Sequence, residues 1–527
     1  MYFNFQFRHP NFPNSHMNQL KRLFASLLTL AMIWWSLPAG NALAKTTQNQ
    51  GSIQPYLQQV VNNLTEFRLD NGMKFLVLER HQAPVVSFLT YADVGGVNEE
   101  SGKTGIAHFL EHLAFKGTTR IATKDYQAEK PLLERLEELD NQIRTAKAAN
   151  QQEKVTSLTA EFQQVEAKAT ALVNQNELGR IVEQAGGVGL NASTSTEATK
   201  YFYSFPANKL ELWMSLESER FLEPVFREFY KEKDVILEER RLRVDNSPIG
   251  LMIEKFNDVA YQVHPYKRPV IGYEQDIRNL TPADLREFFA THYTPNNLTI
   301  AVVGDVNPVQ VKQLAQTYFG RFQTKAKPQT KIPVEPKQTE TRQITVELPS
   351  QPWYLEGYHR PAITHPDDAV YDIIARILSD GRTSRLYKSL VEQKQLALSA
   401  QGFSGFPGDK YPNLMLFYAL TAPGKSVDTV ATALRQEIDK LQIETVTPEE
   451  LQRVKVQAKA ELVRSLDSNM GMAQQLLEYE VKTGSWKNLF AKLEQVAAVT
   501  PEDIQRVSKA TFTAENRTVG KLLSKKV

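Results

Sequence analysis

One stretch of this 527-residue sequence points to its fold and its chemistry: Gly105-Ile106-Ala107-His108-Phe109-Leu110-Glu111-His112-Leu113-Ala114-Phe115. No glycine or proline interrupts it after Gly105, so we expect a helix. On a helix, His108 and His112 lie one turn apart on one face, where both imidazoles can reach the same metal ion. Glu111 shares that side and can take a proton from water at the metal. The stretch therefore predicts a metal site with an adjacent general base.

A second segment offers the ligand that two histidines leave missing. Glu232 and Glu239 stand seven residues apart, or two helical turns, and so share one face of an expected helix. Two histidines and Glu239 leave a fourth position open for water, as a catalytic zinc requires. Without the histidines, a solvated charged helix would be the better interpretation of these glutamates. With them, the sequence predicts zinc bound by His108, His112 and Glu239, with Glu111 activating the water.

The composition narrows the alternatives. The chain has no cysteine, which rules out disulfides, thiolate ligands and a cysteine nucleophile. Its formal net charge of +2 gives no indication of nucleic acid binding. A hydrophobic fraction of 42% suits a globular protein with more than one core. We therefore expect one zinc ion per chain, held by His and carboxylate side chains alone.

The N-terminus has the order of a secretory signal peptide. Lys21 and Arg22 precede an apolar run at residues 23–37, and the small-residue triplet Ala42-Leu43-Ala44 follows. The run is shorter than the roughly 18 residues that a membrane span needs. We expect removal of residues 1–44 and a periplasmic or secreted protein. An uncleaved membrane anchor is the alternative.

Two heptad stretches mark an insertion at residues 126–178. Apolar residues recur there every three or four positions on both sides of a polar turn at 150–152. This pattern predicts an antiparallel coiled-coil hairpin. We expect it to project as a spacer or docking arm with no part in the chemistry. Its apolar positions are Leu132, Leu136, Leu139, Ile143 and Ala146, then Val155, Leu158, Phe162, Val165, Ala169 and Leu172.

An internal repeat divides the rest of the chain into two halves. The segment 281–285 returns as 500–504, and 293–297 returns as 512–516, both 219 residues later. Each copy predicts a helix capped by its threonine, then a turn and an apolar strand.

The expected fold is α+β, with two related α/β halves that each have a mostly antiparallel sheet covered by helices. The first half, 45–322, carries the metal site; a Pro- and Lys-rich linker follows at 323–342, and the second half, 343–527, has no metal site. A β-hairpin turning at Asn71-Gly72 and a strand at Val85–Ala92 open the first half. The polar residues 45–62 indicate a loose leader.

These motifs resemble the pitrilysin/insulinase family of zinc metallopeptidases, the inverzincins with an inverted His-x-x-Glu-His motif. The resemblance is strongest to the branch of mitochondrial processing peptidase and its bacterial relatives, and it covers nearly all of residues 65–527. It implies a zinc endopeptidase acting on peptides or unfolded polypeptide segments, with Glu239 as third ligand and Glu232 supporting the site. The matching motifs are GxAHFLEHLxFKGT at 105–118, LNAxTS at 190–195, TxYF at 199–202, YxPxN at 293–297 and VVGD at 302–305.

One departure concerns spacing. The interval from His112 to Glu239, 127 residues, is longer than the family usually shows. The excess is about the size of the 126–178 insertion, and an insertion that leaves and re-enters near one point need not move the ligands. Glu239 therefore remains the expected third ligand.

The resemblance also implies a peptide-binding strand. In the family, the strand that matches this region is a sheet edge that pairs with the substrate backbone. That edge would be formed here by Asn191, Ala192, Ser193 and Thr194, before strand character at 199–205. An ordinary sheet strand is the alternative.

A second departure bears on partners. The family's second half can carry an Arg and, seven residues later, a Tyr, which reach the substrate at the zinc. Val391 and Leu398 stand at those positions here, and neither can donate a hydrogen bond to a developing oxyanion. Arg385 and Tyr387 are near but wrongly spaced. We expect a related subunit to supply the pair in a heterodimer, with a homodimer as the runner-up.

Two other functions stay open at this stage. The chain could be a catalytically silent scaffold or processing subunit of a hetero-oligomer. It could also hydrolyse phosphoesters, although such enzymes usually need two metals or more carboxylates. The sequence does not give the cleavage preference, the physiological substrate, the partner's identity, the hairpin's target or the fate of the signal segment.

Overall fold

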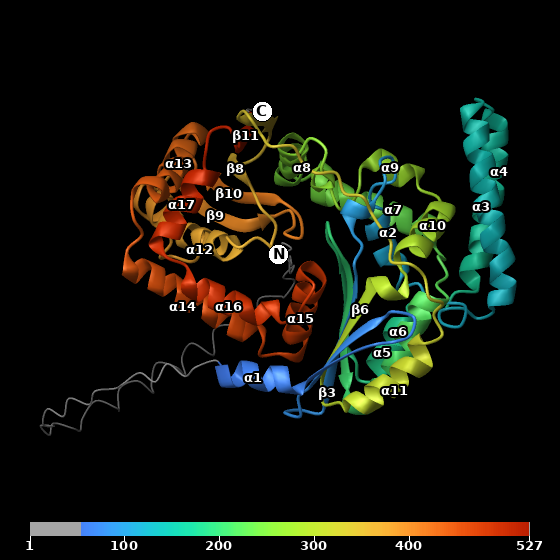
Figure 1. Ribbon diagram of the computed structural model, residues 1–527. Coiled ribbons are helices and arrows are strands. Elements are labelled where there is room, and N and C mark those ends of the chain that lie inside the picture. The colour runs from blue at the N-terminus through green and yellow to red at the C-terminus, as the bar shows by residue number, and fades with distance from the viewer. Residues whose placement is uncertain (1–53, 526–527) are drawn as a thin grey trace, which may run out of the picture. The chain divides into compact units, whose positions relative to one another are not determined.

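Two β-sheets with packed helices organise the computed structural model, which describes residues 54–525 (Figure 1). The expected signal segment, 1–44, lies outside these residues. The strands are β1 (Leu64–Arg68), β2 (Lys74–Glu79), β3 (Val85–Ala92), β4 (Val188–Thr194), β5 (Thr199–Pro206), β6 (Leu298–Gly304), β7 (Arg342–Leu348), β8 (Trp353–Arg360), β9 (Ala397–Phe406), β10 (Asn413–Thr421) and β11 (Arg517–Ser524). The six-stranded sheet has the order β1-β2-β6-β3-β5-β4, and the five-stranded sheet β7-β11-β8-β10-β9. Most pairs are antiparallel, while β2–β6 and β7–β11 are parallel. The expected α+β class is confirmed.

Helices fill the intervals between the strands. They are α1 (Gln54–Asn63), α2 (Ile106–Leu113), α3 (Tyr126–Ala148), α4 (Gln152–Ala171), α5 (Glu177–Gln184), α6 (Leu210–Leu222), α7 (Phe229–Arg240), α8 (Pro248–Ala260), α9 (Glu274–Asn279), α10 (Pro282–His292), α11 (Pro308–Phe319), α12 (Asp368–Ser379), α13 (Val427–Ile443), α14 (Pro448–Ser465), α15 (Asn469–Thr483), α16 (Asn488–Ala498) and α17 (Pro501–Thr511). Helix α1 corrects one expectation, since residues 54–62 were predicted to be a loose leader. Val60 packs there with buried Leu76 and Leu476, which explains why this segment is folded and not loose.

The internal repeat is confirmed in three dimensions. Thr281 caps α10 and Thr500 caps α17, each in a capping box with the aspartate three residues later. A strand follows each helix, β6 in the first copy and β11 in the second. The sequence repeat therefore corresponds to one helix–strand unit used twice.

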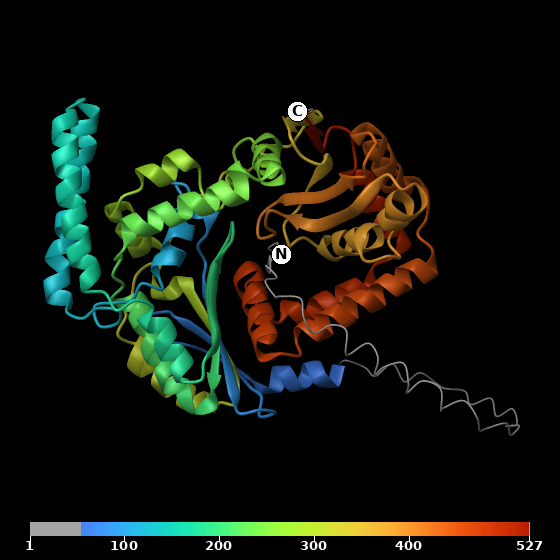
Figure 2. The same ribbon diagram turned by 180° about the vertical axis from the view of Figure 1, so that it is seen from behind.

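The 126–178 insertion forms a helical hairpin of α3 and α4, visible as the long helix pair in both views (Figures 1 and 2). The chain leaves and re-enters at one point, because Thr123 and Val173 form a β-bridge. The hairpin is not free at its base, however. The side chain of Glu129 is fully buried against Arg227 at 2.8 Å, and Arg144 donates to the carbonyls of Asn279 and Leu280. The first half thus holds the hairpin along α3.

Each half contributes a helix to the other half's sheet. Helix α15 packs on β3 and β6 of the six-stranded sheet, and α8 packs on β7 and β11 of the five-stranded sheet. Room for α8 comes from Gly520, where a Cβ would lie 2.4 Å from Met252 and 2.9 Å from Phe256. The two helices also begin alike, with Ser247 and, 221 residues later, Ser468 as caps.

Residues from Tyr56 onward consequently form one compact unit. The division of the chain into two halves at the 323–342 linker stays a prediction, because a helix from each half packs on the sheet of the other half. No helix within residues 54–525 has both the length and the apolar character to cross a membrane.

Candidate active site

Helix α2 carries the central motif and begins at a glycine that no other residue could replace without strain. Gly105 has φ 86°, and a Cβ there would lie 2.6 Å from the carbonyl oxygen of Ile271. Glu99 caps the helix, because its carboxylate accepts the N–H groups of Gly105 and Ala107, both at 3.0 Å. Burial raises the pKa of Glu99 to about 8. Glu99 belongs to no sequence motif, so the sequence alone does not identify it.

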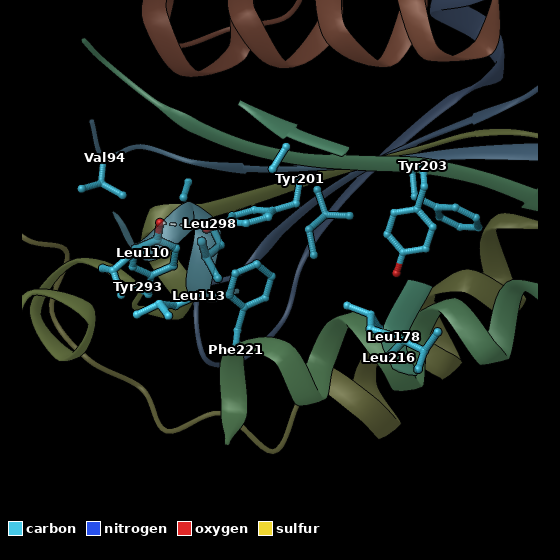
Figure 3. Close-up of a cluster of buried hydrophobic side chains, with 14 of the residues drawn as sticks. Val94, Leu110, Leu113, Leu178, Tyr201, Tyr203, Leu216, Phe221, Tyr293 and Leu298 are labelled. Atoms are coloured by element: carbon cyan, nitrogen blue, oxygen red, sulfur yellow. Dashed lines mark hydrogen bonds between the residues drawn. The ribbon is translucent and has the colours of Figure 1, made fainter. Parts of the chain in front are cut away.

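The inner face of α2 is anchored in the hydrophobic core (Figure 3). Leu110 and Leu113 belong to the same buried cluster as Tyr201, Phe221 and Tyr293. The hydroxyls of Tyr201 and Tyr293 are hydrogen-bonded at 3.1 Å. This packing fixes the helix so that its other face presents the motif side chains.

The three expected metal ligands meet. Nε2 of His108 lies 3.7 Å from Oε2 of Glu239, and Nε2 of His112 lies 3.4 Å from the same oxygen. One potential ligand atom from each residue lies within 4.8 Å of the others. Two ligands that are each about 2.1 Å from one tetrahedral zinc stand about 3.4 Å apart. The donor set of two imidazoles and one carboxylate therefore fits zinc in both chemistry and spacing.

The two histidines differ in protonation. Burial lowers the pKa of His108 to about 4, so its imidazole is neutral, as a metal ligand must be. Burial also lowers the pKa of His112, but hydrogen bonds to Glu232 and Glu239 outweigh it and raise the pKa to about 9. A metal at His112 would therefore displace a proton.

Glu232 lies where the resemblance implied. Its Oε2 is 3.3 Å from Nδ1 of His112, the ring nitrogen that faces away from Glu239. Such a carboxylate orients a ligating imidazole and raises its basicity. Its Oε1 lies 2.6 Å from Nζ of Lys116, which is also 3.2 Å from Glu228. Lys116 and Glu228 were not identified from the sequence, because their pairing joins segments more than 100 residues apart.

Glu111 is hydrogen-bonded to Thr194 at the sheet edge and lies near enough to His112 and Glu239 to feel their charges. Burial raises the pKa of its carboxyl, and a hydrogen bond from Thr194 and the charge on His112 only partly offset this. A raised carboxyl pKa suits a group that must accept a proton and release it again near neutral pH.

The expected peptide-binding residues lie on an edge strand. β4 is the last strand of the six-stranded sheet and is hydrogen-bonded to β5. Asn191 is exposed and Ser193 half-buried, while Ala192 and Thr194 are buried. The Asn191 side chain accepts the N–H of Ala192 at 2.8 Å. The structure thus brings Thr194 to Glu111 and leaves Asn191 at the surface.

The second half places apolar groups at the positions of the missing Arg/Tyr pair. Leu398 is the second residue of the edge strand β9 and is 53% exposed. Val391 is half-buried against the core of the second half. Arg385 pairs with Glu450 at 2.6 Å, so its guanidinium has an ion-pair partner within the second half.

Two family models match the chain. The model described as insulinase (peptidase family M16) matches residues 74–130 and 163–274. The model described as the peptidase M16 inactive domain matches residues 279–458. The break at 131–162 falls inside the α3–α4 hairpin, as the long His112–Glu239 interval predicted.

Individual relatives agree with this match. The chain is 32% identical over 426 residues to the zinc protease PqqE of Helicobacter pylori, covering 79% of this chain and 82% of that protein. It is 24% identical over 458 residues to a probable mitochondrial-processing peptidase subunit beta of Schizosaccharomyces pombe, covering 84% and 87%. A crystal structure of a protease from Helicobacter pylori superposes with a TM-score of 0.74 at 28% identity, covering 87% of this chain and 99% of that one.

Proposed function

The chain belongs to the insulinase family, peptidase family M16, and we propose from this membership that it is a zinc-dependent endopeptidase cleaving peptides or unfolded polypeptide segments. One observation carries the proposal: His108, His112 and Glu239 converge within 4.8 Å, with Glu111 in the same helix as the histidines. Every donor that the chemistry requires is therefore in place.

Each residue has a distinct role in the proposed hydrolysis. One zinc ion per chain, held by His108, His112 and Glu239, would lower the pKa of water and polarise the scissile carbonyl. Glu111 takes the proton of the attacking water and delivers it to the leaving amine. Glu232 holds the imidazole of His112 in the tautomer and orientation that ligation needs. The free edge of β4 hydrogen-bonds the backbone of an extended peptide, which gives affinity with little sequence dependence.

The alternative is a catalytically silent scaffold or processing subunit. The match of the second half to an inactive-domain model is compatible with either role, because that half has no metal site in the enzyme proposal either. The complete donor set in the first half favours the enzyme. Phosphoester hydrolysis fits less well, since residues 54–525 hold a single group of potential metal ligands.

The test compares zinc content and peptide cleavage. We expect stoichiometric zinc in the purified protein, and Glu111→Gln should retain the zinc while lowering cleavage of an unstructured peptide at least 100-fold. An unaltered rate in Glu111→Gln would refute the assignment. Protein that holds no zinc with its natural partners present would refute the enzyme proposal itself.

We further propose that a related subunit completes the substrate site. The support is the pair Val391 and Leu398, whose side chains cannot stabilise an oxyanion. A homodimer is the runner-up. We expect the chain alone to cleave unstructured peptides weakly and a co-purifying homologue to restore the rate. Full activity from a monodisperse monomer or homodimer would contradict the proposal of a related subunit.

Export remains part of the proposal. The support is the order of charged, apolar and small residues in 1–44, and N-terminal sequencing of the native protein is the test. A chain that begins after Ala44 is the expected result, in the periplasm or outside the cell.

A further inference from the structure

Arg243 lies beside the candidate metal site without belonging to any motif. Its Nη1 is 2.7 Å from Oε1 of Glu239. The other oxygen, Oε2, is the one that lies 3.4 Å from His112 and 3.7 Å from His108. The two oxygens of Glu239 therefore have different partners.

The backbone at Arg243 is held firmly although its side chain is 68% exposed. Residues Arg241–Asp245 form a π-turn in which the N–H of Asn246 donates to the carbonyl of Arg241 at 2.7 Å. Gly250 of α8 packs against this turn, since a Cβ there would lie 2.0 Å from the carbonyl oxygen of Arg243. π-turns inside helices frequently occur at functional sites.

The base of the turn is equally constrained. Arg240 donates to the carbonyl of Gly272 at 2.6 Å and pairs with Glu254 at 2.9 Å. It also lies 3.3 Å from Asp245, at the end of the turn. These contacts fix the point from which the Arg243 side chain returns to Glu239.

An ordinary exposed ion pair contributes little free energy, and the chain contains such a pair close to Arg243 in the sequence. Arg241 and Glu238 lie 2.5 Å apart with side chains that are 55% and 52% exposed. Arg243 differs because its partner, Glu239, is only 18% exposed and faces two imidazoles. A glutamate side chain has several rotamers, so a donor on one oxygen restricts where the other can point.

We propose that Arg243 is a positioning residue for the metal site: it holds Oε1 of Glu239 so that Oε2 faces the imidazoles of His108 and His112. The inference rests on the proposed zinc site and goes beyond it by assigning a residue outside the ligand set. Partners that orient ligating groups typically contribute 10- to 100-fold in metal affinity.

A competing electrostatic effect has the opposite sign. The positive charge of Arg243 repels a dication, so its removal could strengthen zinc binding. That repulsion passes through water, because the guanidinium is largely exposed, and it is screened further by salt. The contact of Arg243 with Glu239 at 2.7 Å is screened less by salt than the longer-range repulsion, so we expect positioning to dominate.

The experiment measures zinc affinity by competition with a chelator in the full-length protein, at 0.15 M and 1 M salt. We expect Arg243→Met to bind zinc about tenfold or more weakly than wild type at both salt concentrations. Arg243→Lys keeps a single donor and should recover part of the affinity. The matched control is Arg241→Met, which removes the neighbouring pair and should bind zinc as wild type does.

The outcomes separate the two proposals. Unchanged or stronger zinc binding by Arg243→Met, in a wild-type background that binds zinc, would overturn the role of Arg243 and leave the proposed function intact. Absence of zinc binding in wild type would overturn both. Thermal unfolding of the metal-free variants provides the structural readout, and equal melting temperatures with weaker zinc binding would support positioning.

Discussion

At the scale of single residues, the proposed metal site depends on side chains that hold helix α2 in place. Glu99 accepts two N–H groups at the start of α2, so each motif residue stands on a helix whose first turn is capped. Neither N–H has water available, because the Glu99 side chain and the residues around it are buried. The cost of losing this cap therefore includes unsatisfied buried donors.

We expect Glu99→Gln to lower the free energy of unfolding by about 1–2 kcal/mol. A neutral carboxyl, the form that a pKa of about 8 favours at neutral pH, can turn its single O–H away from both donors, whereas the amide turns an N–H₂ group toward one of them. Chemical denaturation of the metal-free protein measures the effect. Glu100→Gln is the control, since Glu100 is 79% exposed and should leave stability within about 0.5 kcal/mol. Equal stabilities of the two variants would contradict the capping role.

At the scale of elements, the α3–α4 hairpin combines a structural base with a separable tip. Near the base, the guanidinium of Arg227 binds Glu129 and the carbonyls of Lys116, Thr118 and Ile121, which directly follow α2. Both charges of this pair are buried. Beyond the contact of Arg135 with Glu161, α3 is still held to the first half by Arg144, which donates to the carbonyls of Asn279 and Leu280.

Replacing residues 147–154 by a short Gly/Ser loop should leave zinc affinity unchanged, because that segment lies beyond both the Glu129–Arg227 pair and the Arg144 contacts. The comparison is the longer replacement of residues 128–176. It leaves Arg227 buried without its partner, and we expect a loss of about 3 kcal/mol of stability. Zinc titration and urea denaturation of both variants provide the measurements. Loss of zinc from the shorter replacement would place the hairpin tip in the core.

The helices also show how much of the structure could be predicted from the sequence. The helical spacing of His108 and His112 and the seven-residue spacing of Glu232 and Glu239 place side chains on one face wherever the helix lies, so this part was predictable. The hairpin was predictable for the same reason. Whether it is a coiled coil in the strict sense, and whether it docks to anything, stays a prediction.

Long-range pairings could not be predicted in this way. The partners Glu129 and Arg227 are 98 residues apart, and neither belongs to a repeat or motif. An amphipathic pattern shows that α8 and α15 bury one face, but it does not tell which sheet they cover. The exchange of these helices between the halves therefore emerged only from the structure.

At the scale of the whole molecule, a charge cluster of one buried and three half-buried side chains joins the two halves. Lys482 of α15 lies 3.2 Å from Glu197, 2.6 Å from Asp409 and 2.9 Å from Glu478. Glu197 follows β4 by three residues and also accepts the N–H groups of Asp409 and Lys410. One lysine thus forms ion pairs with carboxylates from both halves, close to the strand edge that we propose binds the peptide.

Lys482→Met should lower the free energy of unfolding by about 1–3 kcal/mol, because it leaves buried Glu197 and half-buried Asp409 and Glu478 without their shared cation. Lys459→Met, at an exposed position of α14, is the control and should change stability by less than about 0.5 kcal/mol. Urea denaturation at neutral pH measures both. Equal effects of the two substitutions would show that the cluster contributes nothing to stability.

The same cluster predicts a pH dependence. Burial raises the pKa of Glu478, but Lys482 and Lys200 outweigh it and lower the pKa to about 2. The folded state thus binds this proton less readily than the unfolded chain, whose ordinary value is 4.5. The contribution of Glu478 is full above about pH 4.5 and is lost as the pH falls through about 2. Lys482→Met should flatten this part of the stability profile.

The open edge of β4 has a consequence for the protein in concentrated solution. An unpaired strand offers its N–H and C=O groups to any extended chain, including another copy of itself, and so can seed aggregation. Here the pairing of β4 with β5 is irregular between Val188 and Asn191, and the strand has seven residues. Such a bulge twists an edge away from flat stacking. The irregularity makes the edge a poor template for fibrils and still leaves it open to the short peptide that we propose as its ligand.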